Sequence, residues 1–188
     1  MKYLVFNYLN IDLDNIFLIL SKSFDKRKYV INQDFFNTDF LKNSTSNDMG
    51  FPKAIFFSPK NCQDKTIMIS NYKDGWVTLG NFISNEYGAF NYNFRLSQDD
   101  SLINSFNYWE KGKELRVVYT MKDTKWVFYE QGNPLWFEDT NNYKKRFIKD
   151  RLNFNILTLY CKKIGIDILN NDFFKSDKEA VYIKQMNW

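Results

Sequence analysis

The chain has 188 residues, a net charge of +4 and no histidine, yet it contains 19 Phe, 12 Tyr and 5 Trp. The lack of histidine removes the commonest general acid or base, the usual partner of a serine or cysteine nucleophile, and a favoured zinc ligand. The aromatic surplus must be buried or presented to a partner, because large exposed apolar patches are a liability unless they bind something. The composition therefore favours binding over catalysis.

The first quarter of the chain predicts a strand, a helix and a second strand. Residues 2–8 form a short apolar run, and Asp12 suits the N-cap of a helix. That helix carries apolar residues at helical spacing, namely Leu13, Ile16, Phe17 and Leu20. Another strand is expected near 28–32, and residues 42–50 carry the strongest loop signal.

The next elements are short. Residues 54–57 lie between two prolines and predict a buried or edge strand, and 66–70 predict another. The apolar residues of 76–87 have helical spacing, and Gly88 is placed to end that helix.

Three strand-like runs with hairpin-length linkers occupy the middle of the chain, at 103–110, 114–121 and 126–131. In the second run Leu115, Val117, Tyr119 and Met121 share one face, and Arg116, Val118 and Thr120 share the other. This alternation predicts an antiparallel meander with one drier face.

The C-terminal part predicts a long helix over about 143–164, with an apolar stripe and Gly165 in a left-handed conformation at its end, and a last strand at 180–185. The predicted fold is thus a single globular α+β domain, residues 1–188. Its antiparallel sheet has the three-stranded meander at the centre, and the N-terminal helix and the long C-terminal helix pack on it.

Motifs for cofactors and metals are missing, so none is expected. No two glycines have the G-x-G spacing, and the partial phosphate loop at Gly75 and Gly80 lacks its lysine. Cys62 and Cys161 are too few and too distant to indicate a metal site. Cys161 suits a core position, and a bridge between the two cysteines stays open as an alternative.

Carboxylates are the only strong acid–base resource of the chain. Glu130 and Glu138 flank the loop at Pro134 and are the pair that would serve glycoside chemistry in a carboxylate-based hydrolase. With 22 acidic residues such pairs are common, so this hypothesis ranks below binding.

Five aromatic residues are the candidates for a partner-binding surface: Tyr72, Trp76, Trp109, Trp126 and Trp136. Core packing is the alternative for each of them. Tyr72, Trp76 and Trp136 lie beside turns and are favoured for that reason. Basic runs at 26–28 and 144–146 leave a nucleic-acid-binding module, with aromatics of the meander as a stacking platform, as a further hypothesis. No targeting or membrane-spanning segment is visible, so a cytoplasmic protein that does not enter the membrane is expected.

Four stretches in roughly the C-terminal two-thirds share a likeness to one group of proteins: Gly75-Trp76-Val77-Thr78-Leu79 with Phe82-Ile83, Phe94-Arg95-Leu96-Ser97, Lys149-Asp150-Arg151-Leu152, and Ile164-Gly165-Ile166-Asp167-Ile168. In these stretches the chain resembles small bacterial immunity proteins of polymorphic and contact-dependent toxin systems. The resemblance carries no catalytic signature. It implies a cytosolic, non-enzymatic protein that binds and neutralises a toxin domain.

Overall fold

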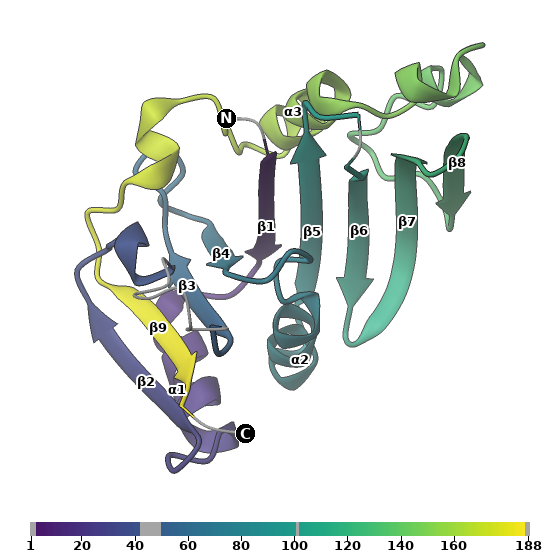
Figure 1. Cartoon of the computed structure of the whole chain (residues 1–188). Coiled ribbons are helices and arrows are strands. Elements are labelled where there is room, and N and C mark those ends of the chain that lie inside the picture. Colours follow the sequence, from purple (N-terminus) through teal and green to yellow (C-terminus); the bar gives the residue numbers. More distant parts are fainter. Residues whose placement is uncertain (1–2, 42–49, 101, 187–188) are drawn as a thin grey trace.

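A computed structural model describes residues 3–41, 50–100 and 102–186, and within them the chain forms one nine-stranded antiparallel sheet with three α-helices (Figure 1). The strands run β2-β9-β3-β4-β1-β5-β6-β7-β8 across the sheet. The helices are α1 (Leu13–Ser23), α2 (Val77–Tyr87) and α3 (Phe154–Lys163). The strands are β1 Tyr3–Leu9, β2 Tyr29–Asp34, β3 Lys53–Phe57, β4 Thr66–Ser70, β5 Phe90–Ser97, β6 Asn104–Glu110, β7 Lys113–Lys122, β8 Trp126–Gln131 and β9 Ala180–Gln185. The predicted mixture of helices with an antiparallel sheet is confirmed.

The local signals at the ends of α1 and α2 work as the sequence predicts. Asp12 caps α1, because its Oδ1 accepts the backbone N–H of Asn15 at 2.8 Å. At the end of α2, Gly88 adopts a φ of +72°, and its N–H donates to the last turn of the helix.

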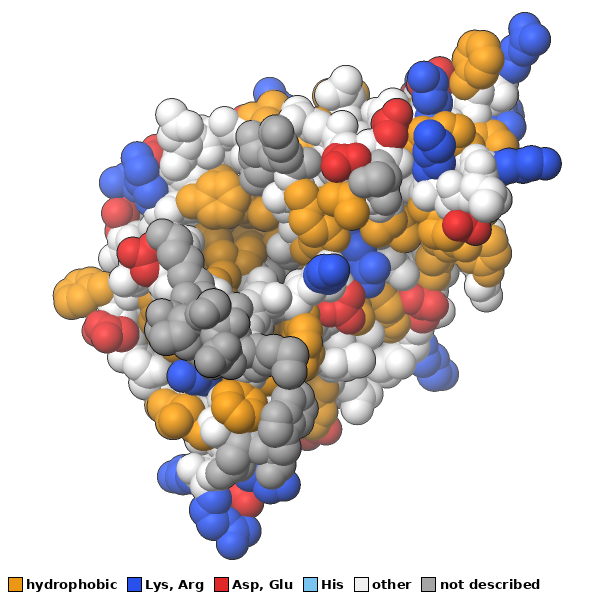
Figure 2. Space-filling model, viewed as in Figure 1, with side chains coloured by type: hydrophobic (Ala, Val, Ile, Leu, Met, Phe, Trp, Pro, Cys, Tyr) orange, Lys and Arg blue, Asp and Glu red, His pale blue; other side chains and the backbone are white. Residues whose placement is uncertain are grey.

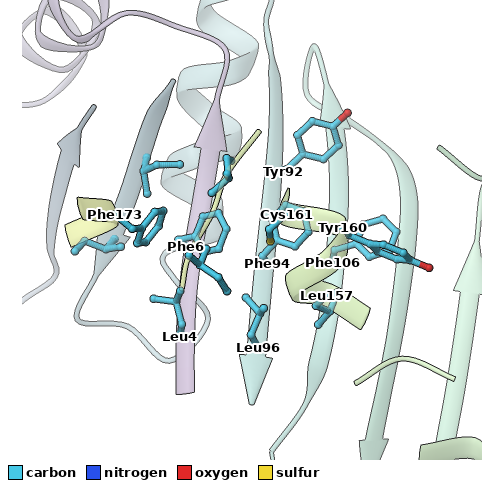
Figure 3. Close-up of a cluster of buried hydrophobic side chains, with 14 of the residues drawn as sticks. Leu4, Phe6, Tyr92, Phe94, Leu96, Phe106, Leu157, Tyr160, Cys161 and Phe173 are labelled. Atoms are coloured by element: carbon cyan, nitrogen blue, oxygen red, sulfur yellow. The ribbon is translucent and has the colours of Figure 1, made fainter. Parts of the chain in front are cut away.

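Each face of the sheet carries its own hydrophobic core, and the core under α1 and α2 does not extend to β7 and β8. On one face Phe6, Phe94 and Phe106 pack against α3, which contributes Leu157 and Tyr160 (Figure 3). On the opposite face α1 and α2 bury a second cluster, whose members from the strands include Leu9, Ala54, Phe56, Met68, Val181 and Ile183. Successive residues of a strand point to opposite faces, so Phe56 and its neighbour Phe57 belong to different cores.

The predicted long helix over 143–164 is wrong. Two single 3₁₀ turns, Asn142–Lys144 and Ile148–Asp150, precede α3, which starts only at Phe154. The helix begins there because the Asn153 side chain accepts the N–H of Ile156 at 3.1 Å and so caps it. The expected left-handed Gly165 is confirmed, with a φ of +81°.

The three predicted middle strands are β6, β7 and β8, but they form one end of the sheet and not its centre. The central position belongs to β1, which pairs with β4 and with β5, and β5 was not predicted. The buried side of β7 is not the side with the more hydrophobic residues. Arg116, Val118 and Thr120 are all at most 1% exposed, whereas the apolar alternate row reaches solvent.

Two smaller expectations have different outcomes. The loop predicted over 42–50 lies, apart from Gly50, outside the described residues. Cys62 and Cys161 are both free thiols and both buried, so the alternative of a bridge between them is wrong.

Candidate interface on the open sheet face

One face of β7 and β8 presents apolar side chains to solvent. We call it the open sheet face, and it consists of Val117, Tyr119, Met121, Val127 and Tyr129. Val127 is 39% exposed and Tyr129 41% exposed, and Leu115, at the neighbouring bulge, is 44% exposed. Figure 2 shows hydrophobic side chains over β7 and β8, on the right of the view. A contiguous apolar surface of this kind marks an interaction site more often than scattered single residues do.

The β7–β8 register arranges this face. Tyr119 lies opposite Tyr129, and their rings stack at 5.2 Å between centroids with 25° between the ring planes. Met121 lies opposite Val127, and the Tyr129 hydroxyl donates to the Gln131 side chain at 2.7 Å. Cross-strand pairs hold one another in place, so a partner would meet a surface that is already ordered.

A buried ion-pair network holds the other side of the same strands. Arg116 on β7 is 1% exposed, and the side chain of Glu138 is completely buried. The Arg116 guanidinium makes five hydrogen bonds, two to Glu138, one to Glu130 at 2.7 Å, and one each to the carbonyl oxygens of Gln131 and Gly132. All five donors of the side chain are therefore used.

The network also satisfies the carboxylate of Glu138. Besides Arg116, the Leu135 N–H and the Tyr143 hydroxyl each donate to it at 2.7 Å. Burial acts to lower the pKa of Arg116, but the hydrogen bonds and charges of Glu138 and Glu130 outweigh it and raise that pKa. Burial, with help from Tyr160 and Glu138, raises the pKa of the Tyr143 hydroxyl. Both groups stay protonated at any ordinary pH, so the network keeps its hydrogen bonds and can fix the loop after β8.

This geometry bears on the hydrolase hypothesis. Glu130 and Glu138 do converge, but they converge on one guanidinium, and the Glu138 side chain has no contact with solvent. A general acid must exchange its proton with a substrate that can reach it. The pair therefore serves to fix the loop after β8, and it leaves this hypothesis without its proposed residues.

Charged side chains of both signs border the open sheet face. Lys122, Asp123 and Lys125 are exposed at the β7–β8 turn, and Lys113 and Glu114 are exposed at the far end of β7. Arg95 of β5 lies in the same row across the sheet as Tyr119, because Arg95 pairs with Ser105 and Ser105 with Tyr119. A partner with an apolar centre and a charged, polar rim would complement this surface.

The open sheet face ends at a free strand edge. Within the described residues β8 is the last strand of the sheet and pairs only with β7. An unpaired edge offers main-chain N–H and C=O groups to another chain, and natural proteins usually protect it.

The structure does not bring the five sequence-predicted site residues together. Among the described ring contacts, only Tyr72 and Trp76 meet, at 5.7 Å between centroids. Trp109 lies on β6 beside the β6–β7 bulge, and Trp126 starts β8 on the face opposite to Tyr129. Trp136 is 74% exposed in the loop after β8, where it contacts only Phe137 among the described aromatic rings.

Sequence reasoning found the alternate row of β7 but did not identify it as the exposed one. A charged residue in a strand normally marks the side that faces solvent. Arg116 is buried instead because it pairs with Glu138, and the sequence alone does not show that pairing.

Metal-binding clusters and membrane-spanning helices are absent from the described residues. No cluster of three or more acidic or cysteine side chains among them could hold a metal ion. None of the described helices combines the length and apolar character needed to cross a bilayer. No protein-family model, curated protein or solved structure matches this chain.

Proposed function

We propose that this chain is a non-enzymatic protein-binding protein that docks its partner on the open sheet face. Its most concrete form is a bacterial immunity protein that neutralises a toxin domain in the cytoplasm, as the sequence resemblance implies. The partner it would fit has an apolar centre and charged residues around it.

One observation carries the proposal: the chain buries an arginine at 1% exposure on one side of β7 and leaves Val117, Tyr119 and Met121 on the solvent side. Burial of an arginine costs free energy unless every donor is paired, whereas burial of Val, Tyr and Met is favourable. A strand that buries its arginine and exposes its apolar row is expected where that row binds a partner protein.

The experiment compares two exposed valines on strands at opposite ends of the sheet. Val127 of β8 is 39% exposed and Val30 of β2 is 47% exposed, so aspartate is tolerated similarly at both. The product of the gene adjacent to this chain's, which the proposal expects to be the toxin, is co-expressed with it, and growth rescue and complex formation by size-exclusion chromatography are measured. Val127→Asp should abolish rescue and the complex, and Val30→Asp should leave both unchanged.

A second pair of variants separates this surface from the one favoured by sequence alone. Tyr129 is 41% exposed and Tyr72 is 39% exposed. Tyr129→Ser should weaken the complex at least tenfold, as expected at an interface hot spot, and Tyr72→Ser should not. The proposal fails if no complex forms, or if the β8 variants bind as tightly as the controls. Salt-dependent binding of oligonucleotides without protein binding would instead indicate the nucleic-acid function.

A further inference from the structure

A polar pocket of about 700 Å³ lies at the opposite part of the sheet, beside the start of α1. It shares no residue with the open sheet face. Ligand pockets in proteins usually measure about 300–1,000 Å³. Its wall is formed by the β1–α1 connection, the ends of β2 and β3, the start of β4, the end of α2 and the residues before β9.

The pocket is strongly acidic in a basic protein. Its lining includes Asp12, Asp14, Asp64 and Glu179, against a single cation, Lys178. The whole chain carries a net charge of +4. A polycation is therefore not attracted to the protein as a whole, and any attraction comes from this local field.

Two of the four carboxylates are uncommitted. Asp12 accepts hydrogen bonds from Asn15, and Asp64 forms an ion pair with Lys65 at 2.7 Å. Asp14 and Glu179 have no hydrogen-bond or ion-pair partner among the described residues, so both can accept a ligand.

Two largely buried residues with unpartnered hydroxyl groups in the wall supply a second, independent observation. Ser58 is 6% exposed and Thr66 is 3% exposed, and neither side chain has a hydrogen-bond partner among the described residues. Continuing the β3–β4 register by one residue and the β3–β9 register by two places Ser58 beside Thr66 and Glu179 on the face that α1 covers. Both residues line the pocket, so their unpartnered hydroxyls can pair with a ligand that enters it.

We propose that this pocket binds an extended aliphatic cation with two or more ammonium groups. Each ammonium donates up to three hydrogen bonds, which the free carboxylates and the two hydroxyls accept. Tyr87, 48% exposed in the wall, offers a ring face to a cation, and Ile11 and Leu13 offer apolar contact to a methylene chain. The same chemistry is present in a free polyamine and in lysine side chains presented by another protein.

The test uses the full chain and calorimetric titration at low salt with two probes, spermidine and the peptide acetyl-Lys-Ala-Ala-Lys-amide. Binding of spermidine supports the site with a free polyamine as its source, and binding of the peptide alone supports it with a partner's lysines as the source. Binding of neither probe overturns the proposal.

Variants decide whether the binding is at this pocket. Asp14→Asn and Glu179→Gln should weaken it up to about fivefold each and roughly tenfold together, because the carboxylates are exposed. Asp123→Asn, an exposed aspartate in the β7–β8 turn, is the matched control and should have no effect. Equal effects of all three substitutions would overturn the proposed location.

Removal of the hydroxyl groups separates a role in ligand binding from a role in stability. Thr66→Val keeps the shape of the side chain and removes the unpartnered hydroxyl. It should weaken binding severalfold while leaving the melting temperature of the free protein unchanged or higher. Ser58→Ala provides the same test at a second position. Variants that bind normally, or that lose stability without losing binding, would contradict a role of these hydroxyls in the site.

Discussion

Replacement of Arg116 by methionine should be among the most destabilising single changes in this protein. Methionine fills similar space but leaves the Glu138 carboxylate buried without its cation, and it also removes the bonds to Gln131 and Gly132. Loss of one partner of a buried ion pair typically costs about 3–5 kcal/mol. For a chain of this length that corresponds to a fall in melting temperature of roughly 6–20 °C.

The assay is thermal and urea unfolding followed by circular dichroism. Arg146→Met, at an exposed arginine, is the control and should change the free energy of unfolding by less than about 0.5 kcal/mol. The double variant Arg116→Met/Glu138→Gln should lose less unfolding free energy than the two single variants lose together. The difference should be about 1–3 kcal/mol, because the two side chains interact directly. If Arg116→Met lowered the free energy of unfolding no more than the Arg146→Met control, the ion-pair network of Arg116 would not be what holds the loop after β8.

Three further predictions concern local structure. Gly132→Ala should cost at least about 2 kcal/mol, since Gly132 has a φ of +85° and an added Cβ would lie 1.9 Å from a main-chain oxygen of β7. Gly88→Ala, with a φ of +72° and open space around it, should cost only about 1 kcal/mol; equal losses in urea unfolding would contradict the steric argument. Burial raises the pKa of Cys62 to about 11 and that of Cys161 well above its usual value, so native protein should react slowly with a thiol reagent at pH 8 and rapidly once unfolded. The backbone N–H at the start of α1 lowers the pKa of Asp12, so its capping contribution is present above its unfolded pKa and is lost as the pH falls through its folded pKa. Asp12→Ala should cost about 1 kcal/mol at pH 7 and less below about pH 4, as measured by unfolding at the two pH values.

The sequence by itself determined the features that depend on neighbours along the chain. The cap at Asp12, the end of α2 at Gly88 and the last strand at 180–185 follow from side-chain hydrogen bonds, backbone preferences and short-range patterns. The predicted long helix failed for a local reason as well, because the Asn153 side chain caps α3 and the helix therefore starts well inside the predicted range of 143–164.

The strand order and the exposed side of β7 were decided only by the tertiary structure. Pairing of β1 with both β4 and β5 joins residues far apart in the chain, and no local pattern encodes it. The side of β7 that faces solvent depends on where Glu138 lies, since an arginine can be buried only when a carboxylate and carbonyl oxygens meet all its donors. The acidic pocket has the same origin, because its walls come from six separate segments that only the folded sheet brings to one place.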